Sequence, residues 1–149
     1  FSILRNSNIG RKLKVFGDQI VTAEMLYNDM IQNGLPLLRK AQEIIEYFKP
    51  KLWFIENPAT GRMKEFLTDL NYYDVDYCQY SDWGYKKSTR IWTNKTDFIP
   101  KICNNQCPNF IPGTKKHKSQ ISRKIGNEKL PLLDMKYRIP PNLIRELIN

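Results

Sequence analysis

Three groups of residues have the types and spacing that could support chemistry. The first is Glu56-Asn57-Pro58, which directly follows the apolar run Leu52-Trp53-Phe54-Ile55. A short unbroken apolar run is typical of a strand buried on both faces, as in a parallel sheet. Ligands of open α/β sheets bind at the carboxyl ends of the strands. Glu56 and Asn57 are therefore candidate site residues, although an ordinary acidic turn after a strand has the same composition.

The second group contains the residue types that bind zinc. Cys103 and Cys107, spaced as Cys-x3-Cys, precede His117, the only histidine, and Cys78 could add a fourth ligand from a preceding strand. The spacing is not that of a standard zinc finger, so we expect ordinary free cysteines and regard zinc as the less favoured alternative. An odd count of three cysteines argues against a secreted disulfide framework and favours a reducing intracellular setting.

The third group is basic. Residues 83–149 carry 14 basic and 4 acidic side chains, whereas residues 1–82 carry 10 basic and 11 acidic ones. A one-sided basic field suits a polyanion, of which nucleic acid is the commonest, and the alternative is a solubilising surface. The densest basic stretch contains no acidic residue and consists of Lys115, Lys116, Lys118, Arg123 and Lys124.

Two helices are expected ahead of the apolar run. Thr22 can cap a helix over about 23–33, which Gly34 stops. Pro36 fits the first turn of a second helix, and Pro50 ends it. Six apolar residues at helical spacing give this second helix one apolar face: Leu37, Leu38, Ala41, Ile44, Ile45 and Phe48.

The rest of the chain predicts a thin α/β sheet and a loop-rich segment. The expected elements are a helix over about 60–70, strands at about 73–77 and 89–94, and a closing helix over 139–149. Six of the nine prolines fall between positions 100 and 141, so residues 99–138 predict a long basic loop. Because three strands make a thin sheet, residues 1–98 look like the later half of a larger one.

The hydropathy and the first residues of the chain argue against a membrane protein. No apolar run approaches the ~18 residues that span a bilayer. The first five residues do not begin a signal peptide, because the stretch after them is polar and basic. We therefore expect no membrane partner. The chain does not begin with Met, which indicates processing, trimming or a fragment.

Three segments carry a family resemblance. They are Phe54-Ile55-Glu56-Asn57-Pro58, Tyr77-Cys78-Gln79-Tyr80 and Lys87-Ser88-Thr89-Arg90-Ile91-Trp92-Thr93-Asn94. Together they resemble the cytosine-5 DNA methyltransferases, especially those of phages and giant viruses, in which an apolar strand ends in Glu-Asn-Val or Glu-Asn-Pro and a later strand carries Arg-x-Arg. The resemblance implies the later half of a Rossmann-like class I methyltransferase sheet, with residues 99–138 as a target-recognition-like region.

The resemblance also implies a reaction. Enzymes of this family flip the target cytosine out of the duplex, add a cysteine thiolate to carbon 6, and transfer methyl from S-adenosylmethionine to carbon 5. Glu56 would hydrogen-bond the exocyclic amine and ring nitrogen 3, and Asn57 and Pro58 would fix the turn behind it.

The arginine motif is matched in part. Arg90 corresponds to the second arginine of Arg-x-Arg and would hold the base, but Ser88 stands at the first. Lys86 or Lys87 could substitute there. Both lysines, with the basic stretch above, would contact DNA.

The nucleophile motif of the family, Pro-Cys-x-x-Phe-Ser, is matched only at its end. The chain begins with Phe1-Ser2, so the resemblance would put the cysteine three residues before Phe1 and Ser2 against the DNA.

Other parts of an active enzyme are missing from the sequence. It has no Gly-rich strand-to-helix turn, no Pro-Cys dipeptide and no acidic strand end placed for the adenosine ribose. We therefore expect the S-adenosylmethionine site to lie mostly outside this chain, which alone would be inactive. Its partners would be DNA and a missing amino-terminal half or another subunit, in the host cytoplasm or nucleus if the protein is viral. The alternatives are a degenerate nucleic-acid-binding or structural protein, for example of a virion, and a plain basic α/β interaction module.

Overall fold

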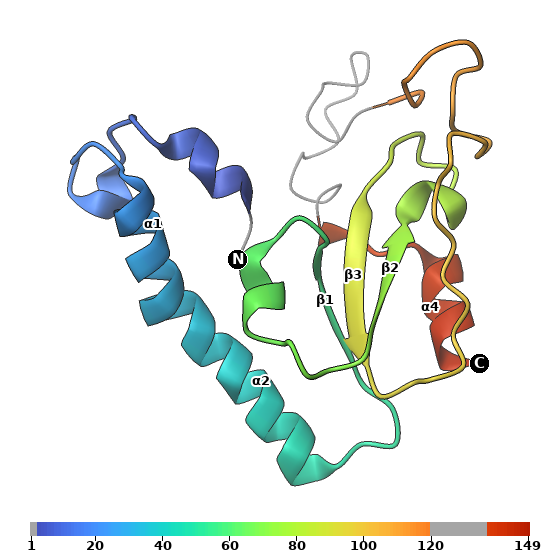
Figure 1. Ribbon diagram of the computed structural model, residues 1–149, viewed down its shortest axis with the longest axis horizontal. Coiled ribbons are helices and arrows are strands. Elements are labelled where there is room, and N and C mark those ends of the chain that lie inside the picture. Colours follow the sequence, from blue (N-terminus) through green and yellow to red (C-terminus); the bar gives the residue numbers. More distant parts are fainter. Residues whose placement is uncertain (1–2, 120–136) are drawn as a thin grey trace. The chain divides into compact units, whose positions relative to one another are not determined.

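The computed structural model describes residues 3–119 and 137–149, and the chain divides into two units. One unit comprises Phe1–Trp53 and Thr60–Thr68, and the other comprises Phe54–Ala59 and Asp69–Asn149. Figure 1 shows the elements in chain order. Three residues predicted to contact DNA lie outside the described residues: Ser2, Arg123 and Lys124.

The first unit is built around one long helical segment. α1 (Ala23–Asp29) begins after Thr22, whose hydroxyl accepts a hydrogen bond from the Met25 backbone N–H at 3.1 Å, as the sequence predicts. The segment continues through a π-helical turn (Met30–Gly34) into α2 (Leu35–Phe48). α1 and α2 therefore form the continuous rod seen in Figure 1.

The prediction that Gly34 stops the first helix is wrong. Gly34 has helical angles, φ −82° and ψ −50°, and the Leu35 N–H bonds to the Met30 carbonyl five residues back. The physical reason lies at Pro36, which has no N–H and whose ring would clash with a carbonyl of the preceding turn. A wider π turn directly before the proline accommodates both features without ending the helix.

The apolar face predicted for α2 is only partly covered in this chain. Leu38 is buried, whereas Leu37, Ile44 and Phe48 are exposed. α2 ends at Phe48, directly before Lys49, which adopts a left-handed conformation with φ 44°, and Pro50 follows as predicted. The helical spacing therefore identified the helix correctly, but not how much of it is buried.

The predicted helix over 60–70 is also wrong. Only a short 3-10 turn, Arg62–Glu65, forms in this stretch. Arg62 donates two hydrogen bonds to the Glu65 carboxylate, at 2.9 and 2.8 Å. Pairing three residues apart matches the three-residue period of a 3-10 turn, and so short a stretch gains too few bonds to offset helix nucleation.

The second unit contains a three-stranded sheet. β1 (Phe54–Pro58) and β2 (Tyr72–Asp76) flank β3 (Ser88–Thr93), and β3 is antiparallel to both. β1 and β2 therefore run in the same direction, with their carboxyl ends at the same edge. The structure confirms the two strands predicted at 73–77 and 89–94.

The apolar run does not form the strand that the sequence predicts. β1 begins at Phe54 and pairs antiparallel with β3, and each of its residues is half-buried instead of buried on both faces. Glu56, Asn57 and Pro58 are the last three residues of this strand and not a turn after it. Pairing reaches Pro58 because β1 is an edge strand, where a missing N–H costs no ladder bond.

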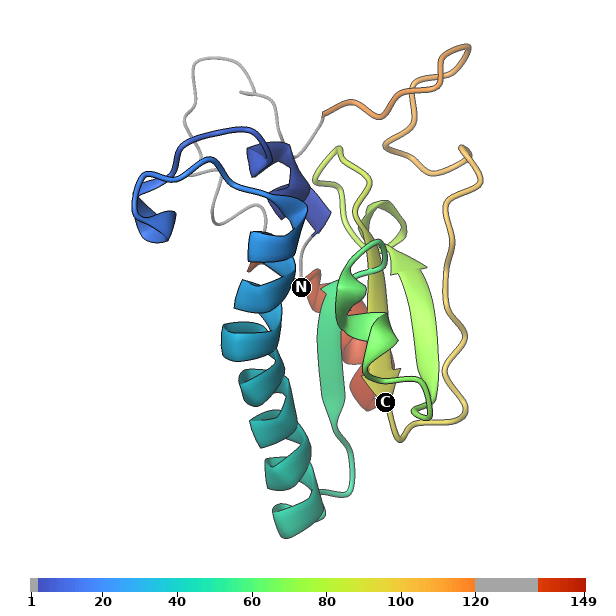
Figure 2. The same ribbon diagram turned by 60° about the vertical axis from the view of Figure 1, so that its left-hand side comes forward.

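A closing helix covers one face of the sheet. α4 (Pro141–Ile148) buries Leu143 and Leu147 against Val75 of β2 and Ile91 of β3. Figure 2 shows α4 behind the three strands. The predicted closing helix is confirmed, and its apolar side chains form the core of the second unit.

The described part of the predicted loop-rich segment has little regular structure. Residues 99–119 contain no helix or strand, and their one isolated bridge joins Phe110 to His117. Among the described residues, none of the helices combines the length and the apolarity that crossing a bilayer requires.

Candidate functional site

Glu56 lies on the face of the sheet that α4 covers. It is paired with Ile91 of β3, and side chains at paired positions share a face. Glu56 is one of the residues that line a hollow of about 120 Å³, and the other lining residues are all apolar. These residues are Phe54, Ile91, Ile139, Ile144, Leu147 and Ile148. A half-buried acid beside apolar side chains forms stronger hydrogen bonds than one in water.

Two donors hold one oxygen of this carboxylate. The Tyr77 hydroxyl donates to Glu56 Oε1 at 3.2 Å, and Lys87 Nζ lies 3.1 Å from the same oxygen. The Lys87 side chain is only 10% exposed and its ammonium lies 4.7 Å from the centroid of the Tyr77 ring. We call Glu56, Tyr77 and Lys87 the Glu56 cluster. No hydrogen bond joins Oε2 to any of the described residues.

Tyr77 acts in this cluster as a hydrogen-bond donor. Burial, and after it the negative charge of Glu56, raise the pKa of the Tyr77 phenol far above its usual value of 10. The phenol therefore stays protonated at any physiological pH. The arrangement fixes the direction of the Glu56 carboxylate and leaves its second oxygen able to accept a hydrogen bond.

Arg90 lies on the opposite face of the sheet from Glu56. It pairs across the strands with Asn57 and Asp74, whereas Glu56 pairs with Ile91, so one residue of alternation separates the two side chains. Arg90 donates to both Asp74 oxygens, at 2.7 and 2.8 Å, and its guanidinium lies 3.7 Å from the centroid of the Tyr72 ring. The hydrogen bonds to Asp74 raise the pKa of Arg90.

We call Arg90, Asp74 and Tyr72 the Arg90 group. The structure therefore does not bring together Glu56 and Arg90, which the resemblance places around one base. Asn57 shares the face of Arg90, and its Nδ2 is a buried donor without an acceptor among residues 3–119 and 137–149.

The two adjacent lysines are held by different carboxylates. Lys87 contacts Glu56, as described, whereas Lys86 Nζ lies 3.1 Å from Asp76 Oδ2 and 3.4 Å from the Cys103 carbonyl oxygen. Of the two candidates to replace the missing first arginine, only Lys87 therefore meets Glu56. Three predicted DNA contacts are exposed, namely Lys115, Lys116 and Lys118.

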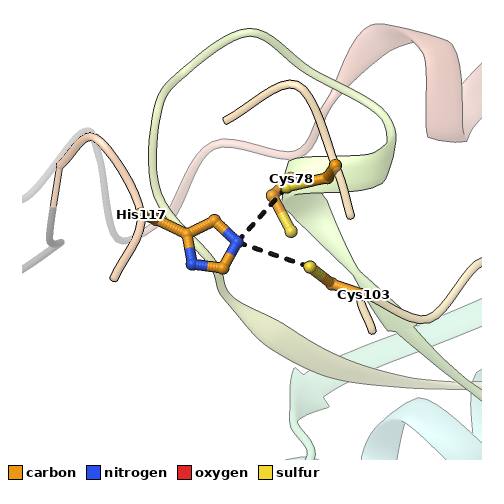
Figure 3. A group of neighbouring side chains, drawn as sticks. Cys78, Cys103 and His117 are labelled. Atoms are coloured by element: carbon orange, nitrogen blue, oxygen red, sulfur yellow. Dashed lines mark hydrogen bonds between the residues drawn. The ribbon is translucent and has the colours of Figure 1, made fainter. Parts of the chain in front are cut away.

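Within the described residues, no disulfide joins Cys78, Cys103 or Cys107 to another cysteine. They are nevertheless neighbours of one another and of His117, with the four potential ligand atoms all within 4.8 Å. Figure 3 shows Cys78, Cys103 and His117 turned toward a common centre. The spacing alone did not favour this gathering.

Comparison with known proteins identifies the family. The chain is 44% identical over 155 aligned residues to a probable DNA (cytosine-5)-methyltransferase of Frog virus 3 (isolate Goorha), and the alignment covers 100% of this chain and 69% of that relative. The chain belongs to the DNA (cytosine-5)-methyltransferase family. No family model and no solved structure matches it. The resemblance drawn from Glu56-Asn57-Pro58 and the two later segments is thereby confirmed.

Sequence reasoning missed one member of the Glu56 cluster. Tyr77 was expected at the end of the strand at 73–77 and within a segment of the family resemblance, but without a role beside Glu56. The available signal was that alternation, since Tyr77 follows Tyr73 and Val75 on the face where Glu56 lies. The register between the strands decides which side chain lies closest to Glu56. A single sequence does not provide that register.

Proposed function

We propose that this chain supplies the base-recognition part of a DNA (cytosine-5)-methyltransferase. The observation that carries the proposal is the geometry of Glu56, whose Oε1 is held by Tyr77 and Lys87 and whose Oε2 has no partner among the described residues. A carboxyl group oriented in this way can present its second oxygen to the exocyclic amine of a flipped cytosine. The 44% identity to a probable enzyme of this kind supports the reaction class.

In the proposed reaction Glu56 acts on the ring of the flipped cytosine. Its carboxyl group hydrogen-bonds the exocyclic amine and ring nitrogen 3, and it favours protonation of that nitrogen as a thiolate adds to carbon 6. Lys87 takes the place of the family's first arginine by holding the carboxylate. Arg90, on the other face, is a positioning residue that joins β3 to Asp74 of β2.

The described residues do not fit S-adenosylmethionine, the family's methyl donor, which when bound supplies the methyl group for carbon 5. The three strands contain no parallel strand followed by a Gly-rich turn into a helix. The buried carboxylate at the end of β2, Asp76, is already used by Lys86, the Ser88 hydroxyl and the Cys103 backbone N–H. We therefore assign no step at the cofactor to this chain, and expect it to be inactive alone.

DNA is the proposed partner. Lys115, Lys116 and Lys118 are exposed and would contact phosphates, which gives affinity that falls with salt. Residues 99–138 would then be the target-recognition region, and residues 1–98 and 139–149 would belong to the catalytic domain. A DNA substrate and three free thiols fit an intracellular setting, which for a viral protein is the host cytoplasm or nucleus.

A second candidate is a degenerate relative that binds nucleic acid or serves a structural role, as in a virion. It is supported by the exposed Lys115, Lys116 and Lys118, which can bind a polyanion without any catalysis. Such a protein would need its basic residues for binding, but it would not need the Glu56 cluster.

The test is methyl transfer from labelled S-adenosylmethionine to cytosine in duplex DNA. It uses the protein as its gene encodes it, beside the 149-residue chain. We expect transfer by the former and none by the chain alone. DNA binding without methyl transfer by the encoded protein would instead support the degenerate relative.

A further inference from the structure

Four side chains from three separate segments meet in the second unit. Cys78 lies in a 3-10 turn (Tyr77–Gln79) directly after β2, Cys103 and Cys107 lie in the loop after β3, and His117 returns to them through its bridge with Phe110. The three cysteines are buried and His117 is half-buried. Figure 3 shows three of these side chains converging.

The distances fit the coordination shell of zinc. His117 Nε2 lies 3.4 Å from Cys103 Sγ and 3.3 Å from Cys107 Sγ, and all four ligand atoms lie within 4.8 Å of one another. A tetrahedral zinc with bonds of about 2.3 Å to sulfur and about 2.0 Å to nitrogen sets neighbouring ligand atoms about 3.5–3.8 Å apart. A cation at the centre therefore requires only small movements of these side chains.

Hydrogen bonding alone does not account for this arrangement. A ring nitrogen of neutral imidazole has either one N–H or one lone pair, so Nε2 can make one good hydrogen bond, yet two sulfur atoms lie at bonding distance from it. A metal ion in the middle satisfies Nε2 and the sulfurs together.

Surrounding groups hold the backbone that carries the ligands. The Asp76 carboxylate accepts a hydrogen bond from the Cys103 backbone N–H at 2.8 Å, and Asn109 Nδ2 donates to the Cys78 carbonyl at 3.0 Å. The Phe110 ring packs edge-on against His117, with centroids 5.8 Å apart. The ammonium of Lys86, 3.4 Å from the Cys103 carbonyl oxygen, faces the net negative charge that zinc with three thiolates carries.

We propose that Cys78, Cys103, Cys107 and His117 bind one zinc ion. Four protein ligands leave no open position, so the site is structural and not catalytic. It ties the loop 103–117, which has almost no regular structure, to the turn after β2. That turn also contains Tyr77, so the metal would fix the loop beside the Glu56 cluster. This inference revises the sequence-based expectation of ordinary free cysteines, and it does not depend on the proposed methyl transfer.

The metal content of the protein as its gene encodes it provides the first test. We expect one zinc per chain by elemental analysis after purification without added metal. Replacement by Co²⁺ should give intense visible bands of a tetrahedral site and thiolate-to-cobalt charge transfer in the near ultraviolet. Folded protein that contains no zinc and develops no such bands with Co²⁺ would overturn the proposal.

Two variants of one position locate the site. His117→Gln removes a ligand and should lose the zinc, whereas His117→Cys supplies a fourth thiolate and should keep it, with the cobalt bands shifted by the added sulfur. If His117→Gln does not fold, the His117→Cys spectrum still reports the coordination. Zinc retained in full by His117→Gln, or a cobalt spectrum unchanged in His117→Cys, would refute the assigned ligand set and indicate an adventitious ion only.

Discussion

The two faces of the sheet carry groups with the same kinds of residue. The groups differ in how many oxygens of the carboxylate are bonded. The Glu56 cluster and the Arg90 group each consist of an acid, a base and a tyrosine, and Glu56 and Arg90 lie on opposite faces of the sheet. In the Arg90 group both carboxylate oxygens of Asp74 are bonded to one guanidinium, which stacks on a ring. In the Glu56 cluster both contacts reach one oxygen, and Glu56 lines a hollow whose other lining residues are apolar.

The difference shows how a binding group is distinguished from a structural one. In a bidentate pair both carboxylate oxygens are bonded and the two strands are joined, so the pair contributes to the stability of the fold. A carboxylate fixed through one oxygen keeps the other for a ligand, so its value is in orientation. Residue types alone would rank Arg90 and Glu56 equally, and only the contacts separate them.

The largest effect among the supporting residues is expected at Lys87. Lys87→Met removes the ammonium that orients Glu56, and methyl transfer by the encoded protein should fall about 10²-fold, as for the loss of a preorganised electrostatic donor. Lys87→Arg should restore most of the rate. Lys101→Met is the matched control, because Lys101 pairs with Glu146 far from Glu56 in the sequence and at a more exposed position. Equal rates for Lys87→Met and the control would show that Lys87 has no role in methyl transfer.

A smaller effect is expected at Tyr77. Tyr77→Phe keeps the buried ring but deletes the hydroxyl that donates to Glu56 Oε1. A hydrogen bond to a charged group contributes about 1.5 kcal/mol or more, so kcat should fall about tenfold. The loss should appear in kcat and not in KM for DNA. Tyr72→Phe, on the other face, serves as the control and should leave kcat unchanged.

The smallest effect on the reaction is expected at Arg90. Arg90→Lys breaks the bidentate bond to Asp74 and should lower the free energy of unfolding by about 1–2 kcal/mol, measured by urea denaturation. Methyl transfer by the folded variant should stay within about threefold of the parent, because the opposite face is untouched. A fall in rate as large as that expected for Lys87→Met would instead indicate that Arg90 holds the target base, as the family resemblance implies.

The individual helices and strands were more predictable than how they connect and pair with one another. Thr22, Pro50 and the alternation of Tyr73 and Val75 each act through neighbouring residues, so one sequence is enough to identify the capped helix and the strand. Gly34 misled because its helical angles depend on a widened turn before Pro36. The direction of β1 could not be read either, because an apolar run has the same appearance in parallel and antiparallel pairs.

The site was predictable in its acid and not in its partners. Glu56 could be identified from the sequence because it follows an apolar run. Which of Lys86 and Lys87 contacts it depends on the face of the sheet on which each side chain lies. Zinc was the less favoured alternative because the spacing is not that of a standard zinc finger. Cys78 lies 25 residues before Cys103, and such a set assembles only through the fold. Long-range register is the information that a single sequence lacks.

The central claim, that Glu56 is the group that acts on cytosine, is tested most directly by Glu56→Gln in the protein as its gene encodes it. The amide cannot accept from the exocyclic amine and support protonation of the ring nitrogen as the carboxyl group does. Methyl transfer should therefore fall by about 10²–10⁴-fold with DNA affinity retained. Glu146→Gln, at a half-buried position of α4 where the carboxylate pairs with Lys101, should keep the parent rate. Equal rates for Glu56→Gln and Glu146→Gln would contradict the account.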